Sequence, residues 1–369
     1  MKNSIKIILL FILINLSFKT EGQSSFFDNK LLRADIHYGF VLPEYQDINY
    51  LVNKPINSIE ISLLKKTTGK NYWEQIYKYP EFGITCSFTT LGNKNVFGNE
   101  FGLFPFVQTY LIRKPKFQLT HQFGIGVGYA TKKFDIVSNY ENISVGSNLN
   151  IHFNVKVGTK ILLTDKISLN SGLSFTHFSN ANMAEPNLGL NMFTAYAGLN
   201  YALGQQTDFS KIELEKHQSK HEFAFIYALG GKHTRALQLT TYFTSSFSTE
   251  YKFHWKKKFH FGGGLDLFYD SSTKVEMNSP NSETYQSIYD LRTGIHFSQE
   301  VVYNNFSFIL QEGFYIGLTD HVNQKRMYNR GILRYKFNDR FLVSFSMKSH
   351  LNILDYPEIG FGYYFTRRK

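Results

Sequence analysis

A histidine and a serine lie two positions apart at the end of an alternating segment, "ISLNSGLSFTHFSN" (167–180). Every second side chain of an extended strand lies on the same face, so His177 and Ser179 share one face. A serine hydroxyl next to an imidazole can give its proton to the ring and become a nucleophile when a third group orients the ring. The apolar residues predicted on the same face are Ile167, Leu169, Leu173 and Phe175.

The next alternating segment (187–203) brings more polar groups to this face. If loop 180–186 closes a hairpin with residue 179 opposite residue 187, Asn191 is a diagonal neighbour of His177, roughly 7–8 Å away between backbones. Asn187 or Asn180, together with loop N–H groups, would then bind an oxyanion. Alternatively, the strand has already left the membrane at residue 177, and these polar side chains only meet headgroups and water.

The elements that position these residues alternate over unusual lengths. In "QLTHQFGIGVGYA" (118–130) and "NIHFNVKVGTKIL" (150–162), apolar residues take one parity and polar or small residues the other. Ten or more residues of this kind, separated by polar turns, are typical of an outer-membrane β-barrel with lipid outside and a polar interior. A soluble sandwich would have shorter strands.

Counting these segments predicts an all-β fold. Eight precede residue 205 and about eight follow residue 220, and the polar run between them (205–220) indicates a linker or long turn. We expect an eight-stranded barrel over 23–204 and a second barrel-like region over 221–369, or alternatively one barrel of about sixteen strands. The expected strands are near 31–41, 57–66, 81–91, 98–113, 116–131, 146–164, 166–179, 187–203, 221–230, 236–255, 258–270, 284–303, 305–318, 326–338, 340–352 and 357–366.

The N-terminus and the composition indicate an exported protein. Lys2 and Lys6 precede a short apolar run, 7–18, which predicts a signal peptide over 1–22. The formal charge of +11 favours an anionic partner, for which phosphorylated lipid fits an exported protein better than nucleic acid does. No cofactor is implied. A metal site is a weaker option, because the histidines that would supply it have no ligand spacing: His121, His152 and His177.

The motifs "HFSN" (177–180) and "PNLG" (186–189) resemble those of the outer-membrane lipid A 3-O-deacylase family (PagL), grouped with the acyloxyacyl hydrolase-like barrels. The resemblance covers roughly residues 80 to 204. It implies an eight-stranded barrel in the outer membrane of a Gram-negative bacterium, with an outward-facing Ser/His/Glu triad that removes an ester-linked acyl chain from lipid A or lipopolysaccharide. By this match His177 is the general base, Ser179 the nucleophile and Asn187 an oxyanion-hole residue, with Asn180 a weaker candidate.

The chain departs from that family at the acidic residue. Asn191 stands fourteen positions after His177, where the family has an acid, and an amide orients an imidazole without stabilising its charge. Glu185 is the nearest substitute carboxylate. The departure leaves a second hypothesis open: a non-catalytic barrel, structural or channel-forming, with a vestigial site. The second half has no such site, because its echo, "SMKSHLN", carries no serine after His350, whose parity points to the lumen.

Overall fold

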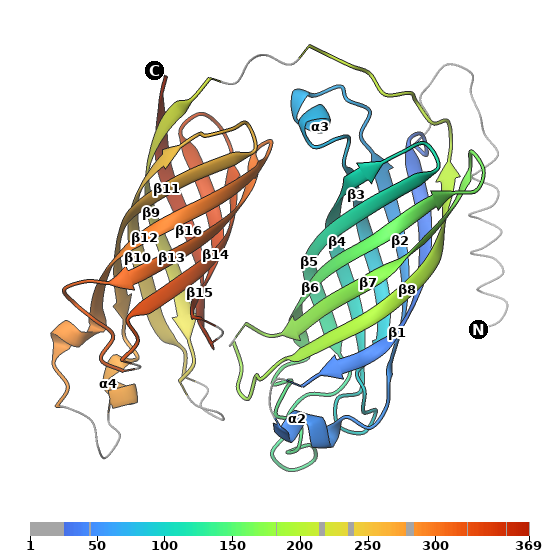
Figure 1. The fold of residues 1–369 in the computed structure, drawn as a ribbon. Coiled ribbons are helices and arrows are strands. Elements are labelled where there is room, and N and C mark those ends of the chain that lie inside the picture. The colour runs from blue at the N-terminus through green and yellow to red at the C-terminus, as the bar shows by residue number, and fades with distance from the viewer. Residues whose placement is uncertain are drawn as a thin grey trace.

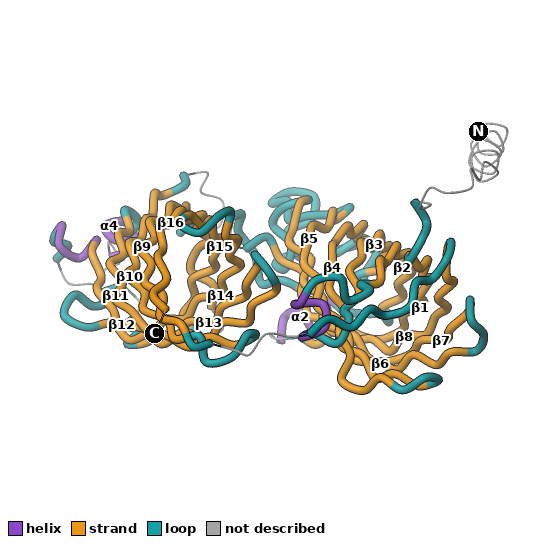
Figure 2. Tube along the Cα trace, turned by 90° about the horizontal axis from the view of Figure 1, so that it is seen from above, coloured by secondary structure: helices purple, strands orange, loops and turns teal. Residues whose placement is uncertain are grey.

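The computed structural model describes residues 26–43, 46–181, 183–213, 218–234, 240–277, 284–322, 324–351 and 353–368. These residues form two closed antiparallel barrels of eight strands each, which stand side by side in Figure 1 and form two rings when viewed from above in Figure 2. The predicted fold class is confirmed, and the alternative of one sixteen-stranded barrel is wrong. The predicted signal peptide, 1–22, lies outside the described residues.

The first barrel closes between its first and last strands, where Lys30 pairs with Leu203. Its strands are β1 (Lys30–Leu42), β2 (Ile56–Lys66), β3 (Glu81–Thr90), β4 (Asn99–Arg113), β5 (Phe117–Ala130), β6 (Leu149–Leu162), β7 (Ile167–Ser179) and β8 (Leu190–Leu203).

The second barrel closes between β9 and β16, where Phe361 pairs with Tyr227. Its strands are β9 (Lys220–Lys232), β10 (Tyr242–Phe253), β11 (Phe259–Asp270), β12 (Leu291–Tyr303), β13 (Phe306–Tyr315), β14 (Met327–Lys336), β15 (Phe341–His350) and β16 (Ile353–Arg368).

Long connections gather at one end of each barrel. Helices α2 (Gln46–Leu51) and α4 (Thr273–Met277) and the 3-10 helix η1 (Ser287–Asp290) belong to this end, which we call the long-loop end. The other end carries mostly short turns and α3 (Tyr72–Ile76), and Figure 1 shows α3 opposite α2 and α4. None of the helices in the described part of the chain is long and apolar enough to cross a membrane.

Side chains alternate between an apolar exterior and a charged interior, as a period of two requires. On β1 the outward Ile36 and Tyr38 are 67% and 64% exposed, whereas the inward Asp35 is buried. Inside the barrel Lys156 Nζ lies 2.5 Å from Glu60 and 3.3 Å from Asp35. These contacts offset the cost of burying the charges, because both carboxylates face the Lys156 ammonium.

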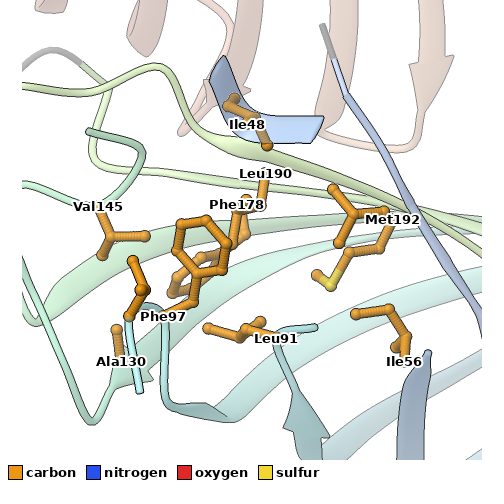
Figure 3. Packing of buried hydrophobic residues seen from close by; sticks show 11 residues of the cluster. Ile48, Ile56, Leu91, Phe97, Ala130, Val145, Phe178, Leu190 and Met192 are labelled. Atoms are coloured by element: carbon orange, nitrogen blue, oxygen red, sulfur yellow. The ribbon is translucent and has the colours of Figure 1, made fainter. Parts of the chain in front are cut away.

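A hydrophobic cluster fills the first barrel at the long-loop end (Figure 3). Phe178 and Leu190 are fully buried in it, next to Val145 from loop 131–148 and Ile48 from α2. Phe178 points inward between two outward-facing neighbours. The end of β7 is therefore anchored in the core at the position where its outer face carries His177 and Ser179.

The two barrels touch near the short-turn end. The Tyr77 ring, just after α3, stacks on Tyr303 with centroids 4.1 Å apart, and its hydroxyl donates to Val302 O at 2.5 Å. The rings of Phe123 of β5 and Phe308 of β13 also meet, with centroids 5.8 Å apart. Aromatic contacts thus join the second barrel to the first.

Candidate active site

The candidate site lies on the hairpin of β7 and β8. His177 pairs directly with Asn191 in the register, and Phe175 pairs with Phe193. The expectation of a diagonal relation between His177 and Asn191 was therefore wrong by two positions. The physical reason is the loop: β8 begins at Leu190, later than the predicted start, so residues 187–189 belong to the connection.

The side chains of Ser179, His177 and Asn191 form a hydrogen-bonded row. His177 Nε2 is 2.8 Å from Ser179 Oγ, and His177 Nδ1 is 2.7 Å from Asn191 Oδ1. An amide oxygen only accepts, so this pairing places the ring proton on Nδ1 and leaves the Nε2 lone pair facing the serine hydroxyl. A neutral imidazole in this tautomer can take the serine proton.

The row lies on the outer face of the barrel. Its three side chains are half-buried, whereas Leu173, on the same face of β7, is 51% exposed and the inward Phe178 is fully buried. Phe153 of β6 pairs with His177 on the other side of β7. The imidazole therefore lies between an aromatic residue and an amide, both on neighbouring strands.

The loop after β7 is held by its own asparagines. Asn180 is fully buried; its Nδ2 donates to Ala184 O at 2.8 Å, and its Oδ1 accepts from Met183 N at 3.1 Å. Asn187 Oδ1 accepts from the Asn180 N–H at 2.9 Å. The Asn180 side chain thus fixes the shape of the loop. Because Asn187 Oδ1 accepts the bond from Asn180, the Nδ2 group is left as the hydrogen-bond donor of the Asn187 amide.

Gly189 packs against the reactive pair, a role that the sequence did not predict beyond its place in the "PNLG" motif. Its φ is +71°, and a Cβ there would lie 3.1 Å from both His177 Cε1 and Ser179 Cβ. Its N–H donates to Ser144 O at 3.0 Å, which ties the site to loop 131–148. The sequence signal for this role was the glycine of the "PNLG" motif itself, because a glycine without a Cβ allows neighbouring groups to approach the backbone closely.

Glu185, the predicted substitute acid, lies in the loop and is partly buried. Burial raises the pKa of its carboxyl, although the Asn187 N–H and the nearby His233 of the second barrel oppose this shift. The Nδ1 position of His177 is occupied by Asn191, not by this carboxylate. Glu185 is therefore not the group that orients the imidazole.

One group among the described residues has the donor arrangement of a metal site: Asp35, His37 and Glu60, with ligand atoms within 4.8 Å of one another. It lies in the lumen of the first barrel. Lys156 Nζ contacts all three, at 3.3, 3.3 and 2.5 Å. An ammonium already supplies the positive charge there, so these residues fit an ion-pair cluster.

Two closed barrels with apolar exteriors and charged interiors define the class of outer-membrane β-barrel proteins. The family model "Lipid A 3-O-deacylase (PagL)" matches residues 57–200, and the model "Acyloxyacyl hydrolase, C-terminal domain" matches residues 221–368. The chain belongs to this PagL and acyloxyacyl hydrolase family, as its motifs predicted. It is thus an ester hydrolase of the outer membrane.

Curated proteins give no match to the chain. Among solved structures, Neisserial surface protein A is 10% identical, with 47% of this chain and 97% of that protein covered and a TM-score of 0.33. OccAB4 of Acinetobacter baumannii is 8% identical, with 92% and 98% covered and a TM-score of 0.25. OccK5 (OpdH) of Pseudomonas aeruginosa is 7% identical, with 91% and 97% covered and a TM-score of 0.24.

Proposed function

We propose that this protein is a serine esterase that removes an ester-linked acyl chain from lipid A, using His177 and Ser179 on the lipid-facing wall of the first barrel. The observation that carries the proposal is the two-sided bonding of His177, to Ser179 at Nε2 and to Asn191 at Nδ1. The match of residues 57–200 to the lipid A 3-O-deacylase model supports lipid A as the substrate.

The chemistry follows the usual course of serine hydrolases. Ser179 Oγ attacks the ester carbonyl while its proton moves to His177 Nε2. The Asn187 Nδ2 group is the candidate donor to the oxyanion that forms. His177 then gives the proton to the leaving alkoxide, and a water molecule activated by the same ring releases the acyl chain as a carboxylic acid.

The depth of the site supports a lipid substrate of the outer leaflet. Outer-membrane barrels keep short turns in the periplasm and longer loops outside the cell. Ser179 is the last residue of β7 and lies at the long-loop end. A nucleophile there would meet the ester groups of lipid A near the membrane surface, and a water-soluble substrate would have no reason to approach this outward wall.

Mass spectrometry of lipid A from cells expressing each variant tests the proposal. Ser179→Ala should abolish loss of the acyl chain, and His177→Ala should reduce it by at least about a thousandfold. Ser171→Ala is the matched control, because Ser171 lies on the same face of β7 and bonds to Thr159 instead. An unchanged lipid A profile with the intact protein would refute deacylation of this lipid.

The non-catalytic alternative keeps one supporting observation, the amide at Asn191 where the family has an acid. A serine-directed phosphonate separates the two hypotheses. Covalent labelling at Ser179 that disappears in His177→Ala supports the esterase, whereas wild-type protein that resists the reagent supports a vestigial site.

A further inference from the structure

The turn between β10 and β11 of the second barrel meets the α3 loop of the first barrel at the short-turn end. Lys258 Nζ lies 4.7 Å from the centre of the Tyr77 ring, and Lys257 Nζ lies 5.6 Å from the centre of the Tyr72 ring. Both distances are those of cation–π contacts. In Figure 1, α3 stands at the edge of the first barrel nearest the second. We call Tyr72, Tyr77, Lys78, Lys257 and Lys258 together the basic seam.

The basic seam brings positive charges of the two barrels close together. Burial lowers the pKa of Lys258, and the nearby charge of Lys78 lowers it further. Within the described part of the chain, neither of these two lysines forms an ion pair with a carboxylate. The acid of the α3 loop, Glu74, is buried and accepts instead from Gly69 N at 2.7 Å and from Asn71 Nδ2 at 2.8 Å. Like charges at a partly buried junction repel, so an anion held between them would lower the energy of the seam.

Hydrogen bonds to the main chain hold both sides of the basic seam in place. In the first barrel Arg113 Nη1 donates to Lys78 O at 2.7 Å and to Tyr79 O at 3.1 Å, so the end of β4 fixes the loop that carries Lys78. In the second barrel Lys258 O accepts from Val302 N at 2.9 Å, across the start of β11 and the end of β12. Each lysine therefore projects from backbone that is bonded to the wall of its own barrel.

The two tryptophans of the chain lie at the same level as the basic seam. Trp73 of α3 packs edge-on against the outward Phe82 of β3, with ring centroids 5.5 Å apart. Trp255, in the β10–β11 turn, is 49% exposed and lies 5.6 Å from the Phe261 ring. Tryptophan side chains gather where a membrane barrel meets the lipid headgroups, and short turns belong to the periplasmic side. The basic seam therefore lies among the headgroups of the periplasmic leaflet.

We propose that the basic seam binds the phosphate of an anionic glycerophospholipid, and that this lipid joins the two barrels. Lys78 belongs to the first barrel and Lys257 and Lys258 to the second, so one phosphate between them makes charge-assisted hydrogen bonds to both. Basic pockets between membrane-spanning elements bind anionic headgroups in this way. A lipid fits better than a soluble polyanion, because the walls below the seam are apolar and receive acyl chains. The inference goes beyond the proposed function, since the seam and Ser179 lie at opposite ends.

Native mass spectrometry of the full-length protein in detergent, with phosphatidylglycerol or phosphatidylcholine added, tests the proposal. Phosphatidylglycerol should stay bound to the wild type, whereas the zwitterionic phosphatidylcholine should be lost. The seam variant, Lys78→Gln/Lys258→Gln, should bind phosphatidylglycerol about 25-fold more weakly, from roughly fivefold for each lysine. Lys166→Gln/Arg367→Gln is the matched control, because it removes one exposed charge from each barrel at the same end. Lys166 lies in the turn between β6 and β7, and Arg367 lies near the C-terminus, on the far side of the second barrel in Figure 1.

Equal binding of phosphatidylglycerol by the seam variant and the control would overturn the proposal, as would equal retention of phosphatidylcholine. Release of the lipid by excess inorganic phosphate would show that the seam takes the free anion, and it would overturn a lipid ligand.

A phosphatidylglycerol analogue with a diazirine in its headgroup locates the binding site. Label concentrated on 72–78 and 256–258, and lost in the seam variant, supports the basic seam, whereas label spread evenly over the short-turn end refutes it. Neither measurement involves ester hydrolysis, so a negative result here leaves the proposed function untouched, and an inactive esterase leaves the seam standing.

Discussion

His177 of β7 and Asn191 of β8 stand directly opposite each other, and a hydrogen bond of 2.7 Å joins the ring Nδ1 to the amide Oδ1. The amide fixes the tautomer that a general base needs, but it brings no negative charge to stabilise the imidazolium formed during attack. The site thus contains a group that orients the imidazole, but it lacks the negative charge that the acid of a catalytic triad supplies.

Replacing Asn191 separates these two contributions. Asn191→Ala removes the orienting bond and should lower kcat by roughly a hundredfold. Asn191→Asp restores a carboxylate that stabilises the imidazolium, so kcat should rise by about tenfold or more. Both rates come from hydrolysis of p-nitrophenyl butyrate at neutral pH. An alanine variant as active as wild type would contradict a role for Asn191 in orienting His177.

Gly189→Ala should damage the site without unfolding the barrel. The new Cβ would press on His177 Cε1 and Ser179 Cβ at 3.1 Å, and the φ of +71° disfavours any side chain. We expect kcat to fall at least about tenfold. Gly331→Ala is the matched control, because a Cβ there meets nothing within 4 Å. Equal activity of the two variants would show that the pair tolerates displacement.

The sequence alone predicts the strands well, because each strand has lipid on one side and a packed lumen on the other. Alternation predicted each of the sixteen strands that the described residues form, including β7 to its last residue, Ser179. The register of the β7–β8 hairpin did not follow from it. Asn180 holds the loop through bonds to Ala184 and Asn187, and Gly189 is bonded to loop 131–148. Periodicity contains no information on such contacts.

The group that orients His177 could likewise not be predicted from periodicity. Glu185 was a reasonable substitute because it lies between the two motifs. The direct pairing of His177 with Asn191 excludes it from Nδ1, and that pairing depends on the register that the sequence did not predict. The pairing of β1 with β8 likewise depends on barrel closure, which brings Phe40 to Phe193 across 153 positions of sequence.

Glu185→Gln should leave kcat within about threefold of wild type, because Asn191 already orients the ring. Its effect should instead appear in stability. Burial raises the pKa of Glu185 in the folded state, so the folded protein binds the proton more tightly than the unfolded chain does. The free energy of unfolding therefore decreases as pH rises from the unfolded pKa of about 4.3 through the raised folded pKa.

The glutamine variant lacks this titration. It should resist urea better than wild type at neutral pH and match it near pH 3, below the titration of both states. Unfolding followed by loss of heat-modifiable electrophoretic mobility measures the difference. A large loss of kcat in Glu185→Gln, with stability unchanged, would instead identify Glu185 as the working acid.

Phe178→Ala should destabilise the first barrel by about 3–5 kcal/mol, because the ring is fully buried in the hydrophobic cluster at the long-loop end. Activity should fall as well, since Phe178 anchors the strand end between His177 and Ser179. Phe178→Leu fills most of the space and should recover most of both losses. Urea unfolding and ester hydrolysis of the two variants provide the comparison.

Tyr77 makes part of the contact between the barrels, because its ring stacks on Tyr303 and its hydroxyl donates to Val302 O. Burial raises the pKa of Tyr77, so the hydroxyl remains protonated and able to donate at any physiological pH. Tyr77→Phe should lose only the hydrogen bond, about 1 kcal/mol of association free energy. Tyr77→Ala should also lose the aromatic pair, worth a further 0.5–1.5 kcal/mol or so.

Cleavage at a protease site inserted between Asp208 and Lys211, followed by co-purification of the halves in detergent, measures the association. Tyr50→Ala is the control, because Tyr50 is 85% exposed on α2 at the opposite end. Halves that separate equally in wild type and Tyr77→Ala would show that this aromatic contact does not hold the barrels together.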